Sequence, residues 1–149
     1  MKPLSRDEQR IHDGLYYRAT ARLEYKYLDL IDSQILKPAQ RPVWEAYRTY
    51  FDAAFRLGFV DISNEQGEQV RALSPKVVEQ VAQAANGVEL HRKRVDVLVE
   101  QAIKTIVNDD QRKKYAALKV ESDAIERQLD AAEQQQRGGA GGASTQPIK

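Results

Sequence analysis

The chain has 149 residues, of which 23 are Lys or Arg and 22 are Asp or Glu, and it contains no cysteine. This near balance of charge gives no overall field that would attract nucleic acid or an anionic membrane, so any basic site must be local. The lack of cysteine excludes disulfides, thiolate catalysis and cysteine-ligated zinc. A chain of this length is sufficient for one domain with one hydrophobic core.

The sequence contains no apolar stretch that approaches the roughly 18 residues of a membrane-spanning helix. Its first residues also lack the apolar core of a signal peptide. We therefore expect no membrane span. The protein would be cytoplasmic as written, and periplasmic if a leader was removed before Met1.

The first expected helix covers about residues 6–35, and a capping box formed by Ser5 and Glu8 predicts its start. Gly14 is expected to mark a bend or frayed first turns, because glycine is a poor helix former. Apolar residues recur every three or four positions, as one helix face requires. They are Ile11, Leu15, Ala19, Leu23, Tyr27 and Leu30.

An aromatic-rich second helix is expected from about residue 38 or 43 to 57, with Gly58 as its C-terminal stop. We expect the rings of Trp44, Phe51 and Phe55 to fill the core beneath the first and third helices. Tyr47 and Tyr50 are equally compatible with the core and with an exposed surface. Residues 59–73 lack sustained periodicity and are interpreted as a connection.

The third expected helix starts at Ser74-Pro75 and continues to about residue 107, with a kink at Asn86-Gly87. The fourth covers about residues 109–136 and has apolar steps of three and four, which predict a coiled-coil-like seam that needs a partner helix. The seam consists of Tyr115, Leu118, Ser122, Ile125, Leu129 and Ala132.

These patterns predict an all-α fold of about four helices in two hairpins, in which the first and third helices are long. The helical domain would cover residues 1–136. The remaining residues, 137–149, are rich in Gly, Ala and Ser, have almost nothing to bury, and are expected to be disordered.

Two helix junctions share the pattern apolar-x-x-x-Gln. The first is Leu36-Lys37-Pro38-Ala39-Gln40 and the second is Val107-Asn108-Asp109-Asp110-Gln111. Asn108 is a good N-cap residue, and Pro38 is placed where a missing N–H costs nothing. Both junctions therefore indicate the start of a helix.

This pair of junctions, with a long helix before the second, resembles the repeated Leu-Thr-x-x-Gln segment of the LTxxQ family of bacterial helical stress proteins, the group of Spy and CpxP. Lys37 and Asn108 replace the threonine of that motif. The resemblance implies a cradle-like homodimer of helical hairpins that acts in the periplasm without ATP, as a chaperone or stress-signalling partner for unfolded or partner proteins. The motif residues would be Leu36, Pro38, Gln40, Val107, Asn108 and Gln111.

Charged residues of alternating sign recur along the second helix from Arg41 to Arg56. We expect a solvated face with intrahelical ion pairs. In the alternative that the resemblance implies, the arginines line a concave surface and steer acidic segments toward apolar patches. The candidate protein-binding surface comprises Arg41, Tyr47, Arg48, Tyr50, Arg56, His91, Arg92 and Arg94.

No motif in the sequence places a nucleophile, and neither His12 nor His91 has a second histidine at chelating spacing. We therefore predict no enzyme, no cofactor and no metal. The basic run at residues 91–94 favours no nucleic-acid site, because consecutive helical residues point in different directions. The alternative to a chaperone is a structural subunit of a virion or secretion machine, whose fourth helix packs on another chain.

Overall fold

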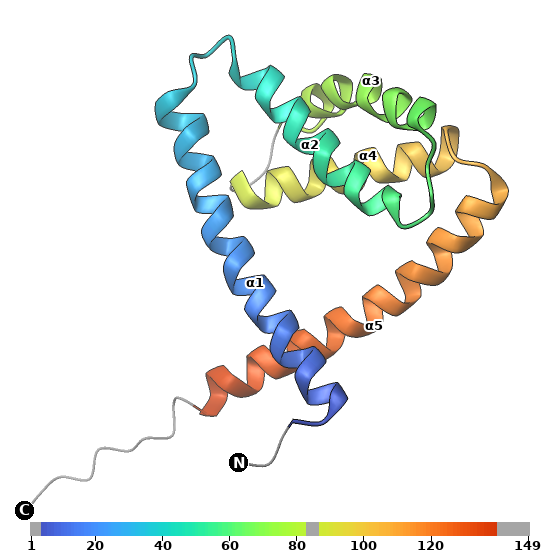
Figure 1. Ribbon diagram of the computed structural model, residues 1–149. Helices are drawn as coiled ribbons and strands as arrows, with labels where there is room; N and C mark the ends of the chain where they lie inside the picture. Colours follow the sequence, from blue (N-terminus) through green and yellow to red (C-terminus); the bar gives the residue numbers. More distant parts are fainter. Residues whose placement is uncertain (1–3, 83–86, 140–149) are drawn as a thin grey trace, which may run out of the picture. The chain divides into compact units, whose positions relative to one another are not determined.

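The computed structural model describes residues 4–82 and 87–139, which form helices and no strand (Figure 1). The predicted all-α class is confirmed. No helix in these residues is long and apolar enough to cross a membrane. The elements are α1 (Arg6–Leu30), the π-helical turn η1 (Ile31–Ile35), α2 (Arg41–Gly58), α3 (Asn64–Gln80), α4 (Gly87–Thr105) and α5 (Asp109–Gly139).

The chain divides into two compact units, each described here by itself. The first consists of Met1–Glu24 and Lys119–Lys149 and contains the first part of α1 and the last part of α5. We call it the two-helix unit. The second, Tyr25–Leu118, contains α2, α3 and α4 together with the end of α1, η1 and the start of α5. We call it the three-helix unit.

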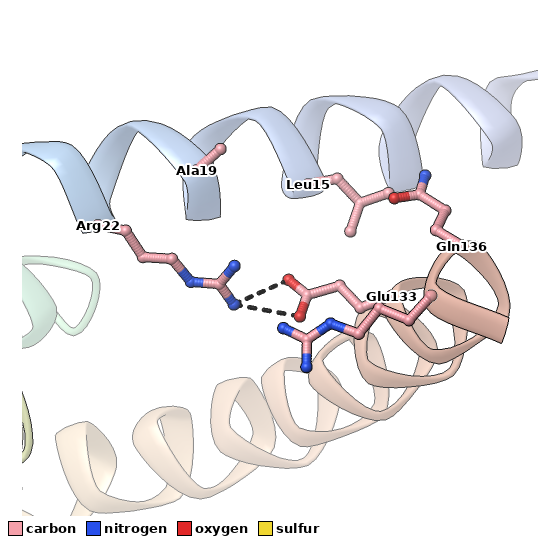
Figure 2. Close-up of a pocket in the computed structure, with 6 residues that line it drawn as sticks. Leu15, Ala19, Arg22, Glu133 and Gln136 are labelled. Carbon is pink, nitrogen blue, oxygen red and sulfur yellow. Dashed lines mark hydrogen bonds and ion pairs between the residues drawn. The ribbon is translucent and has the colours of Figure 1, made fainter. Parts of the chain in front are cut away.

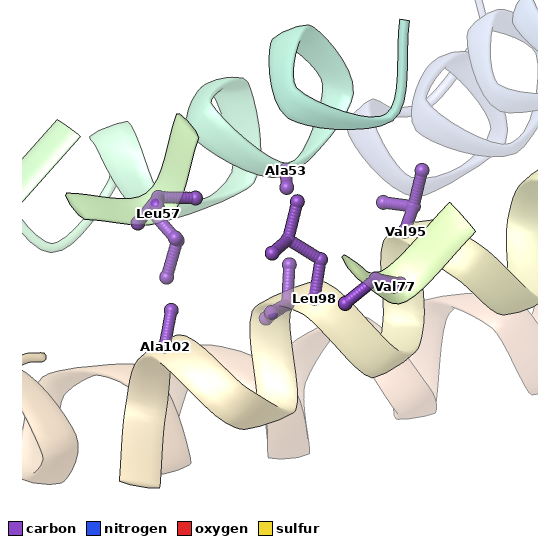
Figure 3. Packing of buried hydrophobic residues seen from close by; sticks show 8 residues of the cluster. Ala53, Leu57, Val77, Val95, Leu98 and Ala102 are labelled. Carbon is purple, nitrogen blue, oxygen red and sulfur yellow. The ribbon is translucent and has the colours of Figure 1, made fainter. Parts of the chain in front are cut away.

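The core of the three-helix unit lies where α2, α3 and α4 pack against one another (Figure 3). Most of its side chains are small or β-branched, so the helices can approach closely. Its two largest members, Leu57 and Leu98, are fully buried. The cluster consists of Ala53, Leu57, Val70, Val77, Val95, Leu98, Val99 and Ala102.

The α3 helix begins at Asn64, well before the expected start at Ser74-Pro75. A capping box explains this start, because the Ser63 hydroxyl accepts the Gln66 N–H at 3.2 Å and Gln66 Oε1 accepts the Ser63 N–H at 2.9 Å. Residues 59–73, expected to form a connection, are thus mostly helical. Pro75 lies inside α3 rather than in a first turn.

The prediction of one long helix over residues 74–107 is also wrong, because two helices occupy this part of the chain. α3 ends at Gln80 and α4 begins at Gly87, so the expected kink is a break, and residues 83–86 lie outside the described structure. The last carbonyls of α3 are bound from α4. Arg94 Nε donates to the Val81 carbonyl at 3.0 Å, and its Nη2 donates to the Val78 carbonyl at 3.3 Å.

The other predicted helix boundaries agree closely with the structure. The Ser5–Glu8 capping box is confirmed, with the Ser5 N–H donating to Glu8 Oε2 at 2.7 Å. α2 ends at Gly58, as expected. α5 continues to Gly139, and the rest of the predicted tail, residues 140–149, lies outside the described structure.

In the two-helix unit, Leu129 of α5 is buried against Gly14 of α1. A Cβ atom added at Gly14 would lie 2.7 Å from Leu129 Cδ2, so the glycine permits the close approach of the two helices. Gly14 lies within continuous α-helix rather than in frayed turns. At Leu129, one residue of the predicted seam, α5 contacts α1.

Candidate functional site: an exposed aromatic row on α2

The α2 helix has two contrasting faces. Its buried face carries Ala46, Thr49, Ala53 and Leu57. Outside this face, apolar side chains recur at every fourth position, follow a ridge that winds around α2, and end at Phe59 directly after the helix. Each is between 52% and 72% exposed. These residues, which we call the aromatic row, are Val43, Tyr47, Phe51, Phe55 and Phe59.

A spacing of four residues places side chains in a single ridge along a helix. Two pairs of neighbouring rings in the row contact each other. The ring centroids of Tyr47 and Phe51 are 6.3 Å apart, and those of Phe55 and Phe59 are 5.5 Å apart in an edge-to-face arrangement. Trp44 lies beside the row and stacks on Tyr47 with centroids 6.2 Å apart. The row therefore contains two pairs of contacting exposed rings, and Trp44 extends one of them.

The expectation that Phe51 and Phe55 fill the core is wrong, since their side chains are 58% and 68% exposed. α2 packs closely against both α3 and α4, and its inner face carries three small residues and Leu57 instead of the rings. Trp44 is half-buried rather than in the core. Of the two tyrosines left open, Tyr47 lies at the surface, whereas Tyr50 is half-buried and packs against the core.

A depression of about 340 Å³ adjoins the row between α2 and α3. Its lining is mostly apolar, and Arg71 is its one charged residue. The ion pair of Arg71 with Glu68 is long, at 3.7 Å, and both side chains are exposed. The lining residues are Pro42, Val43, Ala46, Tyr47, Tyr50, Arg71 and Pro75.

The carboxylates of α2 are directed toward α4. Glu45 Oε2 lies 2.9 Å from Arg94 Nη1, and Asp52 Oδ2 lies 2.7 Å from His91 Nε2. His91 and Arg94 are each only 6% exposed. These two residues of the predicted binding surface are therefore buried, and their contacts hold α2 and α4 together.

Tyr25, from the end of α1, covers His91, with ring centroids 5.6 Å apart. Burial raises the pKa of the Tyr25 hydroxyl, and the negative charge of Asp52 raises this pKa further. The arginines at positions 48, 56 and 92 oppose the shift. The contact is therefore built around a neutral tyrosine.

The arginines of the predicted surface differ in how they are bound. Arg56 is exposed and pairs with Asp96 of α4 at 2.6 Å. Arg41 is half-buried and donates to the Ser33 carbonyl at 3.1 Å. Arg48 is half-buried, and its Nη2 has no partner among the described residues. Arg92 is exposed on α4. The ion pairs of α2 thus connect it to α4. The expectation of intrahelical ion pairs along a solvated face of this helix is therefore wrong.

The two apolar-x-x-x-Gln junctions have different local roles. At the second, Asn108 and Gln111 form a full capping box, with N···O distances of 3.0 and 2.9 Å. At the first, Gln40 accepts the Lys37 N–H at 3.0 Å but provides no side-chain cap for α2. Val107 is buried, Leu36 is half-buried, and Pro38 lies in the turn before α2.

A further copy of this pattern, Ile62-Ser63-Asn64-Glu65-Gln66, begins α3 and was not recognised in the sequence. Its signal was the Ser-x-x-Gln spacing of a capping box. Local helix capping therefore explains the glutamine at Gln66 and Gln111, whatever the ancestry of the chain.

The two-helix unit contains its own depression, of about 330 Å³, lined by Leu15, Ala19, Arg22, Glu133, Gln136 and Arg137 (Figure 2). Arg22 Nη2 donates to both oxygens of Glu133, at 3.2 and 3.1 Å. This hydrogen bond, with the charge of nearby Arg18, holds the pKa of the Glu133 carboxyl below its ordinary value despite an opposing effect of burial. The central charges of this depression therefore neutralise each other.

Within the described residues, no group of three or more His, Asp or Glu side chains is placed to hold a metal ion. No protein-family model, curated protein or solved structure matches the chain. The resemblance to the LTxxQ family therefore stays a prediction. Among the surfaces described, the aromatic row has the most exposed rings, four in number.

Proposed function

We propose that the protein binds other proteins without ATP, as a holding chaperone or stress-response adaptor, and that the aromatic row is the binding surface. The observation that carries the proposal is the row itself, with five neighbouring apolar side chains that are all more than half exposed. Exposed apolar patches of this kind mark protein interaction sites. Aromatic side chains are also enriched in such interfaces.

The chemistry of the row suits noncovalent holding. Phenylalanine and tyrosine rings provide large contact areas with few rotatable bonds, and a tyrosine hydroxyl adds a polar contact at the rim. Because the row lies outside the core, its residues are available to a partner while α2, α3 and α4 remain packed. Binding would therefore require no unfolding of the three-helix unit.

The experiment that tests the proposal is light scattering from a denatured client protein, with this protein added from substoichiometric amounts to several-fold excess and without nucleotide. The wild-type protein should suppress aggregation. The variant Tyr47→Ser/Phe51→Ser/Phe55→Ser should require about ten-fold more protein for the same effect, because central aromatic residues carry most of the binding energy of an interface.

The matched control replaces three exposed apolar residues outside the row, as Tyr16→Ser/Tyr17→Ser/Val120→Ser. Circular dichroism should show the wild-type helical content for both variants. The proposal fails if the wild-type protein leaves aggregation unchanged in excess, or if the control variant loses suppression as fully as the row variant.

A structural assembly subunit is the second candidate, and the regular spacing of the row favours it, since one fixed partner helix would use such a ridge well. This candidate predicts a complex of fixed stoichiometry with one partner and no effect on unrelated unfolded proteins. We also propose the homodimer that the family resemblance implies. Sedimentation equilibrium should give twice the chain mass if it forms.

A further inference from the structure

We infer that the segment bound by the aromatic row is an amphipathic α-helix flanked by acidic residues. The inference rests on the proposed function and narrows it to one class of partner segment. Three features of the three-helix unit lead to it, namely the spacing of the row, the area that it offers, and the charges beside it.

The spacing of the row fits a helix. The row extends over residues 43–59, about 24 Å at 1.5 Å per residue, and forms one ridge. Ridges at four-residue spacing pack into the grooves of another helix. An extended segment gains most of its affinity by pairing with an exposed sheet edge, and the described residues contain no strand. A helix satisfies its own backbone hydrogen bonds and needs only the apolar contact.

The edge of the row also leaves room for a helix backbone. Ala54 and Gly58 follow Phe51 and Phe55 by three residues, so they lie beside the row on the helix surface. A Cβ atom added at Gly58 would meet no atom within 4 Å. These small residues allow a partner helix to pack close to the rings.

The area of the row matches one helix rather than a folded domain. An aromatic side chain buries about 150–250 Å² when fully covered, and the four rings of the row are 52–68% exposed. With Val43, the row therefore offers roughly 500 Å². A standard interface between folded proteins buries about 800 Å² on each side.

The charges beside the row favour an acidic partner. Both carboxylates of α2, Glu45 and Asp52, are paired with buried basic groups of α4. Arg48 Nη2 is buried and has no partner among the described residues, so Arg48 adds positive charge beside the row rather than a free donor. Arg71 is exposed and has only the long contact with Glu68. Arg48 precedes Phe51 by three residues, and Arg71 lines the depression that Tyr47 shares. Complementary charges at the rim increase association and exclude partners of like charge.

Trp44 supplies the readout, because it is the single tryptophan of the chain and stacks on Tyr47. Three tryptophan-free peptides of about 18 residues would be titrated while Trp44 emission is followed. The acidic helix carries Leu at i, i+3, i+4 and i+7, Glu at the positions that flank this apolar stripe, and Ala elsewhere. The basic helix has Lys in place of each Glu. The broken helix is the acidic peptide with two central prolines.

We expect the acidic helix to bind at least about ten-fold more tightly than the other two peptides, and its affinity to fall with added salt. The variants Arg71→Gln and Arg48→Gln should each weaken binding of the acidic helix several-fold and should leave binding of the basic helix equal or slightly stronger, because a like charge is removed. Arg71 is exposed, so its variant tests the charge without endangering the fold. Arg92→Gln, an exposed arginine of α4, is the control and should leave the preference unchanged.

Equal binding of the broken and acidic peptides would overturn the helical partner, and equal binding of the basic and acidic helices would overturn the acidic preference. If the row variant loses client suppression while no peptide preference is found, this inference fails and the proposed function stands. If the wild-type protein binds neither client nor peptide, both fail.

Discussion

The side chains of Gln66 and Gln111 hold each other through two reciprocal hydrogen bonds. Gln66 Nε2 donates to Gln111 Oε1 at 2.9 Å, and Gln111 Nε2 donates to Gln66 Oε1 at 3.0 Å. Each amide oxygen also accepts the N–H of its own N-cap residue. Each amide nitrogen also donates to a backbone carbonyl, of Ile106 and Asp61 respectively. The starts of α3 and α5 are thus joined through two side-chain amides, in which both the oxygen and the nitrogen make two hydrogen bonds each.

This pair predicts strong coupling between the two positions. Gln111→Ala leaves the Gln66 amide and the Asn108 N–H short of partners, so the free energy of unfolding should fall by about 1–3 kcal/mol. The double variant with Gln66→Ala should lose clearly less than the sum of the single losses, because each single change already breaks the shared bonds. Urea unfolding measures all three.

The control for this pair is Gln69→Ala on the exposed side of α3, which should change the free energy of unfolding by less than about 0.5 kcal/mol. Additive losses in the double variant would contradict the coupling.

Arg94 provides a second prediction, because it is buried and binds Glu45 and the carbonyls of Val78 and Val81. Arg94→Met should lower the free energy of unfolding by about 3–5 kcal/mol, since it leaves a carboxylate and the end of α3 without partners. Adding Glu45→Leu should recover part of that loss. The exposed neighbour Arg92 provides the control, and Arg92→Met should have little effect in the same denaturation experiment.

Glu133 predicts how the two-helix unit responds to acid. The hydrogen bond from Arg22 lowers its pKa in the folded protein, from an ordinary value of 4.5. A lowered folded pKa gives stability that is fully present above the unfolded value and is lost as the pH falls through the folded value. Glu133→Gln should therefore lower the melting temperature at pH 7, and the difference from wild type should disappear in strong acid.

The comparison residue for this acid effect is Glu121, which pairs with Arg10 while both side chains are more than half exposed. Glu121→Gln should shift the melting temperature at pH 7 less than Glu133→Gln does, because exposed ion pairs contribute little. An undiminished Glu133→Gln effect in strong acid would assign the loss to packing rather than to charge.

The contact between Gly14 and Leu129 predicts that the effect of Gly14→Ala on stability depends on the residue at position 129. Gly14→Ala gains about 1 kcal/mol in helix propensity, but in the wild type the new methyl group would meet Leu129. In a Leu129→Ala background the contact is gone, so Gly14→Ala should there raise the free energy of unfolding by about the full amount. Thermal unfolding of the four proteins measures the difference. The same gain in both backgrounds would show that the glycine is not required for helix contact.

Several parts of the fold were predictable because their causes are local. Ser5 with Glu8, Gly58 and Asn108 with Gln111 are short-range signals, and each marks a helix end in the structure. The same signal at Ser63 with Gln66 was obscured because Gly67 resembles a loop residue. Gly67 is in fact buried, with the Tyr50 hydroxyl 3.9 Å from where its Cβ would be.

The parts that could not be predicted depend on tertiary contacts. Ser74 resembles an N-cap, yet its hydroxyl donates to the Ala46 carbonyl of α2 in the core. Arg94 resembles a surface residue, and its acceptors come from two other helices. Helical periodicity shows that α2 has an apolar face but not which face packs inward. The small residues pack inward because α3 and α4 both lie close to α2, and this leaves Phe51 and Phe55 exposed.

Under the proposed function, the two faces of α2 are therefore subject to different constraints, packing on one and partner binding on the other. Thr49 and Ala53 face the core, where even one added methylene group would disturb the packing. The aromatic row contributes little to that core. Under the proposed function, descendants of this sequence could exchange one ring for another and acquire new partners while keeping the same scaffold. We expect distant relatives to share the small residues at positions 46, 49 and 53 even where positions 47, 51 and 55 have diverged.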